Sequence, residues 1–353
     1  MKFKSLRLLS ALVAIMLIFT ACTSKAPETQ QETNTTQTET KEETKTEEPA
    51  TVPEEKANIN IAVLKGPTGL GALKLMEDND AKTAKNNYNF TISAAPDEVT
   101  GKVISGEIDI AAVPTNLAAT LYNKTEGKIK LAALNTLGML YVLENGNTIN
   151  SIADLAGKTI YSSGQGATPE YALNYILEQN GIENVTVEYK AEHAELATAV
   201  AAGEVNIAVL PEPNVTAVLL KKPDIRIALD LTEEWNKISE KNNDDSVLSM
   251  GCIIVRTDFL ENNKEAFDTF LDEYKASIEY VTSNVEPSAT LAEKYGILAS
   301  AAAAKSAIPK CNIVYIDGSE IKDSIENFYN VLFEANPKSV GGTLPDENFY
   351  YSK

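Results

Sequence analysis

The feature that most constrains the fold is a ten-residue pattern that occurs twice. Residues 105–114 read SGEIDIAAVP, and residues 202–211, 97 positions further along, read AGEVNIAVLP. Each copy predicts a helix closed by a glycine (Gly106 or Gly203), then a short buried strand, then a proline that ends the strand. Two copies are too few for a solenoid, so the pattern indicates a duplicated unit.

An earlier strand, glycine-rich loop and helix also occur twice, at a similar offset. The expected bounds of strand, loop and helix are 59–64, 65–69 and 70–76 in the first copy, and 159–162, 163–168 and 169–179 in the second. Thr168 is expected to cap the second helix, with Pro169 at its first position. Strands that alternate with helices predict a parallel sheet covered by helices on both faces, so the duplication predicts two similar α/β lobes.

Two apolar runs, 131–143 and 249–257, are candidates for strands that cross between the lobes. Such crossings make the first lobe discontinuous, and helices expected at 262–284 and 319–334 return the chain to it. The predicted division is therefore a first lobe of residues 58–140 plus 258–353 and a second lobe of residues 141–257, with approximate boundaries.

The N-terminal residues resemble a processing signal. Three basic residues precede an apolar run at 8–19 that is short for a membrane span, which predicts a signal peptide over 1–21. The sequence Phe19-Thr20-Ala21-Cys22 resembles a bacterial lipobox, with Phe19 in place of the usual leucine, and predicts an acylated Cys22. The alternative is cleavage by the ordinary signal peptidase and free secretion. Residues 22–57, rich in Thr and Glu, predict a disordered tether.

Composition excludes several classes of function. The net charge of −19 disfavours nucleic-acid binding, which needs clustered Lys and Arg. The sequence contains no hydrolase, zinc-protease or P-loop motif, and the single histidine, His193, is expected to be a surface or lobe-packing residue rather than a catalytic one. Cys252 and Cys311 are expected to be buried thiols, although a disulfide between them stays open. We expect no enzyme activity, no catalytic residue, no metal and no cofactor.

Ligands of open α/β sheets bind beyond the carboxyl ends of the strands. Four loops meet that condition, two from each predicted lobe, and their glycines and helix N-termini present backbone N–H groups. The candidate ligand-binding residues are Lys65, Gly66, Thr68, Gly69, Pro114, Thr115, Asn116, Ser163, Gly164, Gln165, Gly166, Ala167, Thr168, Pro211 and Glu212.

The predicted cleft contains no arginine, because Arg7, Arg226 and Arg256 all lie outside these loops. The absence of a bidentate carboxylate clamp argues against an amino-acid ligand. Two interpretations of Glu212 stay open. It accepts hydrogen bonds from an amino-bearing or cationic ligand, or it is a solvent-facing loop carboxylate. Several aromatic residues could stack on a ring, but packing is the expected role of each: Tyr141, Tyr161, Tyr171 and Trp235.

These segments resemble the nitrate/sulfonate/thiamine-pyrimidine-precursor (NitT/TauT, SsuA-like) family of ABC-transporter substrate-binding proteins. The resemblance covers essentially all of residues 58–353, and the segments that carry it are 63–69, 113–116, 151–160, 162–172 and 344–350. It implies an α/β type II periplasmic-binding fold that closes about a two-strand hinge. It also implies ligand contacts by Thr68, Gly69, Thr115, Asn116, Gln165, Gly166, Ala167, Thr168 and Glu212.

The resemblance further implies a function. The expected protein is a monomer, anchored to the extracytoplasmic face of the cell membrane by its lipid alone, that captures a small molecule and delivers it to an ABC permease. The ligand stays open among nitrate, sulfonates, aminopyrimidines, aromatic acids and other small molecules. The alternative is a lipoprotein receptor or adhesin that binds a protein partner, and a secreted enzyme is the less favoured third reading.

Overall fold

The structure, a computed structural model, describes residues 56–353. The predicted signal peptide, the acylated Cys22 and the tether up to residue 55 lie outside the described residues. Within residues 56–353, no helix combines the length and the apolar character needed to cross a membrane.

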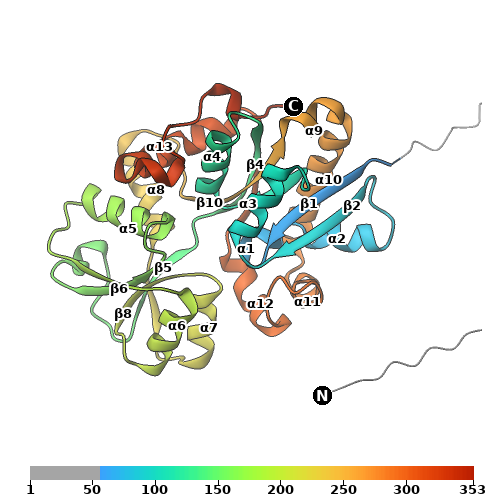
Figure 1. Cartoon of the computed structure of the whole chain (residues 1–353). Helices are drawn as coiled ribbons and strands as arrows, with labels where there is room; N and C mark the ends of the chain where they lie inside the picture. Colours follow the sequence, from blue (N-terminus) through green and yellow to red (C-terminus); the bar gives the residue numbers. More distant parts are fainter. Residues whose placement is uncertain (1–55) are drawn as a thin grey trace, which may run out of the picture. The chain divides into compact units, whose positions relative to one another are not determined.

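The described residues contain a six-stranded mixed sheet built largely from the first part of the chain (Figure 1). Strands β1 and β2 pair in parallel and so do β1 and β3, whereas β10 runs antiparallel to both β3 and β4. The sixth strand, β11, pairs antiparallel with β4. In spatial order the strands are β11 (Ile313–Asp317), β4 (Ile129–Leu137), β10 (Ser249–Arg256), β3 (Ile110–Val113), β1 (Asn58–Leu64) and β2 (Asn87–Ser93).

A second sheet of five strands lies in the middle of the chain. In spatial order its strands are β7 (Thr186–Lys190), β6 (Thr159–Ser163), β8 (Ile207–Pro211), β5 (Leu140–Glu144) and β9 (Arg226–Asp230). The succession β7-β6-β8-β5 reproduces β2-β1-β3-β10: three parallel strands followed by one antiparallel strand. The two lobes predicted from the duplication are thus two copies of one topology, and the fold is the predicted α/β periplasmic-binding fold.

One strand, β10, lies in the first sheet, although the predicted boundaries placed it in the second lobe. Residues 141–257 were expected to form the second lobe, but β10 (Ser249–Arg256) lies in the first sheet, between β3 and β4. The reason is that the chain crosses between the two sheets twice, once in each direction. The chain leaves the first sheet through Gly138 and Met139 to form β5 beside β8, and it returns as β10 to take the matching place beside β3.

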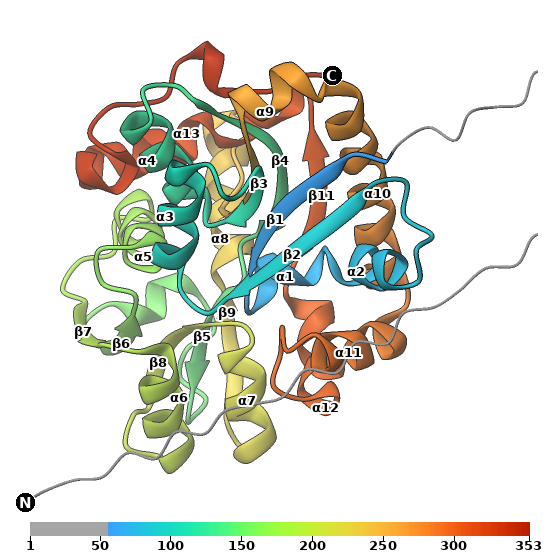
Figure 2. The ribbon, with the colours of Figure 1, turned by 45° about the vertical axis from the view of Figure 1, so that its right-hand side comes forward.

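Helices cover both faces of each sheet. In the first sheet, Ile59, Ile61 and Val63 pack on the side of α2, α10 and α11, and Ala62 and Leu64 pack on the side of α3, α4 and α13 (Figure 2). This alternation follows from the two-residue period of a strand. The helices are α1 (Pro67–Leu70), α2 (Leu73–Asp80), α3 (Pro96–Ser105), α4 (Thr115–Lys124), α5 (Thr168–Gln179), α6 (His193–Ala202), α7 (Asn214–Lys221), α8 (Leu231–Asn242), α9 (Thr257–Asn262), α10 (Lys264–Ser283), α11 (Val285–Lys294), α12 (Ala301–Ala307) and α13 (Glu320–Ala335).

Local signals predicted some helix ends correctly and missed others. Gly106 and Gly203 are the C-caps of α3 and α6, with φ of 85° and 81°, as the duplicated pattern predicts. The helix expected over 70–76 is instead two helices, α1 and α2, separated at Gly71. Gly71 is packed so closely that a Cβ atom there would lie 2.7 Å from the Tyr274 hydroxyl of α10.

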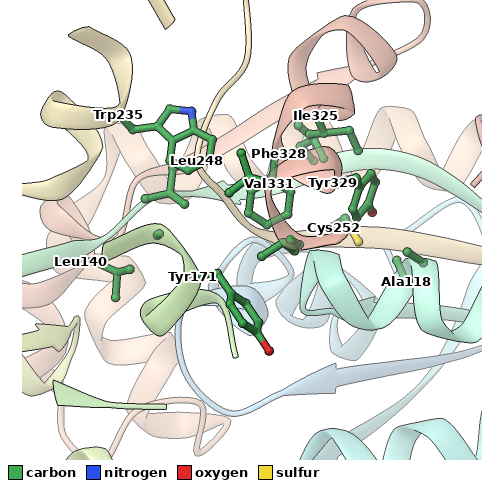
Figure 3. Packing of buried hydrophobic residues seen from close by; sticks show 14 of the residues in the cluster. Ala118, Leu140, Tyr171, Trp235, Leu248, Cys252, Ile325, Phe328, Tyr329 and Val331 are labelled. Atoms are coloured by element: carbon green, nitrogen blue, oxygen red, sulfur yellow. The ribbon is translucent and has the colours of Figure 1, made fainter. Parts of the chain in front are cut away.

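A continuous apolar core connects the two lobes (Figure 3). Trp235 of α8 packs against Tyr175 of α5 and against Phe328 of α13, with ring centroids 4.7 and 6.2 Å apart. The same cluster contains Leu140 of β5 and Cys252 of β10. Cys252 and Cys311 are both free and buried, so the expectation of two buried thiols is confirmed.

Candidate functional site

A cleft of about 890 Å³ lies where the carboxyl ends of strands from both sheets converge. Its volume lies within the range typical of small-molecule sites. Its wall includes residues from the loops after β1, β3, β6 and β8, the four loops that the sequence singles out. The residues that line it are Leu64, Lys65, Gly66, Pro67, Thr68, Ala94, Pro96, Pro114, Asn116, Leu117, Met139, Ala167, Thr168, Pro169, His193, Ala194, Pro211, Glu212, Pro213, Asn214, Met250, Ile297, Leu298 and Ala299.

Nine of the fifteen candidate residues line this cleft: Lys65, Gly66, Thr68, Pro114, Asn116, Ala167, Thr168, Pro211 and Glu212. The other six do not belong to its wall: Gly69, Thr115, Ser163, Gly164, Gln165 and Gly166. Three members of the second group, Gly69, Thr115 and Ser163, support the wall from behind.

Gly69 supports the wall through packing. A Cβ atom at this position would lie 2.2 Å from the carbonyl oxygen of Leu64 and 3.1 Å from Cδ1 of Ile297. Glycine is therefore needed for the close turn between β1 and α1. Gly66, in contrast, has φ of 100°, lines the cleft and has no neighbour within 4 Å of an added Cβ.

Thr115 is also part of the support. Its side chain is 1% exposed, and its Oγ1 lies 2.8 Å from the hydroxyl of Ser249 in β10. The Tyr329 hydroxyl donates to the Thr115 carbonyl at 2.9 Å. Nearby, Asn135 donates to the carbonyl of Thr68 at 3.1 Å, which positions the first turn of α1 from below. Buried polar groups are paired in this way because an unpaired one costs free energy.

The start of α5 differs from the expectation. Ala167, not Thr168, is the N-cap, and Thr168 is the first helical residue, buried in the wall of the cleft. The carboxylate of Glu170 accepts from the backbone N–H of Gly166 at 2.5 Å instead. The predicted cap was wrong because Thr168 already belongs to the helix, one residue after the N-cap, so its side chain lies at the cleft and does not cap the helix.

Glu212 is the carboxylate of the site, and its solvent-facing reading is wrong because the residue is only 1% exposed. Its Oε2 accepts from the N–H of Thr216 at 3.1 Å and its Oε1 from the Thr216 hydroxyl at 3.0 Å. Its own N–H donates to the carbonyl of Met139 at 3.1 Å, which ties it to the crossing between the sheets. Burial raises the pKa of the Glu212 carboxyl, although the Thr216 hydrogen bonds and the charge of Lys310 oppose the shift.

The sequence reasoning missed His193. This residue begins α6, lines the cleft, and places Nδ1 2.6 Å from the hydroxyl of Ser163 at the end of β6. Burial lowers the pKa of His193, so the imidazole is uncharged at neutral pH. One sequence signal could have identified it: α6 follows β7, so its first residue lies at the carboxyl edge of the sheet.

The apolar part of the wall was also missed. Met139 directly precedes β5 at the crossing, Met250 lies in β10, and Ile297 and Leu298 follow α11. Met139 lies in a crossing run that the sequence identified, but nothing local marks the 297–298 loop. The aromatic residues expected to pack are not part of the wall: Trp235 is buried in the core, and the Tyr141 hydroxyl donates to the carbonyl of Lys310 at 3.1 Å.

The comparisons with known proteins agree with this geometry. The family model described as "NMT1/THI5 like" matches residues 92–287. The chain belongs to the NMT1/THI5-like family. This assignment confirms the resemblance to nitrate-, sulfonate- and pyrimidine-type substrate-binding proteins of ABC transporters. The sequence has no match among the curated proteins.

Solved structures resemble this NMT1/THI5-like chain over most of its length. A protein from Parabacteroides distasonis described as an ABC transporter is 28% identical with a TM-score of 0.72, and the match covers 84% of this chain and 100% of that one. The periplasmic aliphatic sulphonate-binding protein SsuA of Escherichia coli is 16% identical with a TM-score of 0.66, over 84% of this chain and 93% of that one. The alkanesulfonate-binding protein SsuA of Xanthomonas axonopodis is 15% identical with a TM-score of 0.58, over 84% and 97%. The two SsuA structures support the fold.

Proposed function

We propose that this NMT1/THI5-like protein is a lipid-anchored, extracytoplasmic solute-binding protein of an ABC importer. The single observation that carries the proposal is the cleft of about 890 Å³, whose wall combines loops from both lobes. A small molecule that contacts both lobes binds the closed form better than the open form and so shifts the population toward closure. The closed form is then the form that a membrane permease recognises.

The cleft wall supports binding rather than catalysis. Its polar side chains are few and come from different elements, and most of the wall is apolar, as is usual for small-molecule sites. His193 and Ser163 form a hydrogen-bonded pair, but Ser163 is buried and lies outside the wall, so it is not placed to attack a ligand. Within the described residues, no group of three or more His, Cys, Asp and Glu side chains is arranged to hold a metal ion.

Ligand capture is tested by thermal-shift measurement of the chain against nitrate, alkylsulfonates and arylsulfonates, aminopyrimidines, aromatic acids and a fractionated metabolite extract. A ligand at about 100 times its Kd adds about 2.7 kcal/mol to the free energy of unfolding and raises Tm by several degrees. A shift with any of these establishes a small-molecule receptor. No shift with any compound or fraction contradicts the proposal and favours a receptor for a protein partner.

The lipid anchor rests on the lipobox-like sequence Phe19-Thr20-Ala21-Cys22. Metabolic labelling with a palmitate analogue is expected to label the wild-type chain and to fail with Cys22→Ala. More than one acyl chain is needed for durable anchoring, so the unlabelled variant is also expected to leave the membrane fraction. Labelling that persists in the variant contradicts the assignment of Cys22.

A further inference from the structure

Several helices begin at the cleft, and a helix N-terminus is the usual place to bind an anion without arginine. In the second lobe, two of these N-termini already carry a carboxylate of the chain itself. Glu170 accepts from the N–H of Gly166 at the start of α5, at 2.5 Å. Glu212 accepts from the N–H of Thr216 in the first turn of α7, at 3.1 Å.

The first lobe repeats this arrangement at α3. The carboxylate of Glu98 accepts from the N–H of Ala94 at 3.3 Å, and Ala94 and Pro96 both line the cleft. The helices α4 and α6 have no side-chain cap, and each contributes an uncharged first-turn side chain to the wall, Asn116 or the neutral His193. The short helix α1 also begins in the wall, at Pro67, and has no acidic residue in its first turn. Three of the six helix starts around the cleft are therefore already occupied by negative charge.

The charged side chains of the wall also disfavour an anionic ligand. Lys65 is the one lysine or arginine of the wall and is solvent-exposed, whereas Glu212, its one carboxylate, is almost completely buried. The two arginines of the described residues are engaged elsewhere: Arg226 pairs with Glu144 at 2.6 Å and Arg256 with Asp258 at 2.5 Å. Lys310, half-buried and outside the wall, also acts on Glu212. A desolvated anion in the cleft thus meets a buried carboxyl group, and the wall itself contains no buried lysine or arginine to offset it.

We infer, on the basis of the proposed function, that the ligand is uncharged or cationic: a largely apolar small molecule whose amine or amidine-like N–H groups donate to Glu212. A carboxylate offers about four acceptor sites, and Thr216 uses one on each oxygen, so both oxygens can accept a further donor. The ligand body contacts the apolar wall of Leu117, Met139, Met250, Ile297 and Leu298. This class differs from the sulfonates named for the two SsuA structures.

The decisive experiment separates ligands by charge. A low-molecular-weight metabolite extract is divided by anion exchange into a retained, anionic fraction and an unretained, neutral and cationic fraction. The full chain is equilibrated with each fraction by dialysis, and bound molecules are identified by mass spectrometry. We expect enrichment from the unretained fraction alone.

Each other outcome overturns the inference in a distinguishable way. A ligand enriched from the anionic fraction refutes the charge class while leaving small-molecule capture intact. Enrichment from neither fraction refutes the proposed function together with the inference that rests on it.

The role of Glu212 is tested with the identified ligand. Glu212→Gln keeps the shape of the side chain and removes its charge, and we expect affinity to fall about tenfold or more. Glu204→Gln is the matched control, since Glu204 is an exposed carboxylate of the same lobe at the far end of α6. Equal affinity in the two variants overturns the assignment. If Glu212→Gln does not fold, the charge-separated dialysis of the wild-type chain still decides the ligand class.

Discussion

At the scale of single residues, the loops that the sequence identified contain two kinds of side chain. Thr115 is used within the protein, where its hydroxyl meets Ser249. Thr168 lies in the wall of the cleft, whereas Gln165, also a candidate ligand-binding residue, is exposed outside that wall. The loop from residue 163 to residue 168 therefore contributes to a site through its last two residues rather than through all of them.

This distinction predicts the outcome of two substitutions in one loop. Thr168→Val removes a hydroxyl at nearly constant volume, and we expect it to weaken ligand binding about two- to tenfold through the loss of one hydrogen bond. Gln165→Ala is expected to leave affinity unchanged. Isothermal titration of both variants with the same ligand checks the assignment, and a larger loss for Gln165→Ala would contradict it.

A second residue-scale prediction concerns the buried Glu144, which is 3% exposed. Burial alone would raise the pKa of its carboxyl, but hydrogen bonds from Thr148, Ile149 and Arg226 outweigh burial and lower it below the usual 4.5. A carboxyl with a lowered pKa stabilises the fold above about pH 4.5, and this stabilisation is lost as the pH falls through the folded-state pKa.

Glu144→Gln is therefore expected to lower the free energy of unfolding by about 1–3 kcal/mol at pH 7. The difference from wild type should shrink as the pH falls below about 4.5, because protonation then neutralises Glu144 in the wild-type protein as well. Urea titrations across this pH range measure it, with Glu178→Gln, an exposed position in the same lobe, as control. A difference that stays constant with pH would rule out the ion pair as its source.

At the scale of elements, the turn between β1 and α1 decides how closely the first helix approaches the sheet. Gly69 and Gly101 offer a matched pair of glycines for testing this turn. An added Cβ at Gly69 would lie 2.2 Å from a backbone carbonyl, whereas one at Gly101, exposed in the middle of α3, would have no neighbour within 4 Å.

Gly69→Ala is expected to lower the free energy of unfolding by about 1–3 kcal/mol, because the backbone must shift to accept the methyl group. Gly101→Ala should raise it by about 0.5–1 kcal/mol, because alanine loses less entropy than glycine in a helix. Chemical denaturation of both variants measures the two effects. Destabilisation of similar size at both positions would show that the close turn is not the cause.

At the scale of the whole folded region, residues 56–353, the two lobes share one apolar core. Trp235 of the second lobe contacts Phe328 of α13, and the Tyr171 hydroxyl accepts from Asn336 at 3.1 Å. The return segment is tied in as well, since the Val247 N–H donates to the carbonyl of Ser324 at 2.8 Å. Separate unfolding of either lobe would expose this shared surface.

We therefore expect residues 56–353 to unfold in a single cooperative transition. Trp235 is the only tryptophan and reports on the junction, while far-UV circular dichroism reports on all helices. The two signals should give coincident melting curves, and the calorimetric and van't Hoff enthalpies should agree. Two resolved transitions would contradict a shared core.

The sequence by itself determined the elements of this protein and their repetition. Strand ends, glycine C-caps at Gly106 and Gly203, and the four loops beyond the strands follow from local patterns of a few residues, and parallel topology brings those loops to one edge. The family resemblance followed from the same local segments. Nine candidate residues reached the cleft for this reason.

Only the tertiary structure decided what those patterns leave open. Contacts between elements decide the place of β10 in the first sheet and the need for glycine at position 69, beside the carbonyl of Leu64. Contacts between residues distant in sequence also bury Glu212. They bring His193, Met250 and Ile297 into the wall of the cleft as well. Local propensity does not predict such contacts, because they are determined by packing between elements rather than by any one segment.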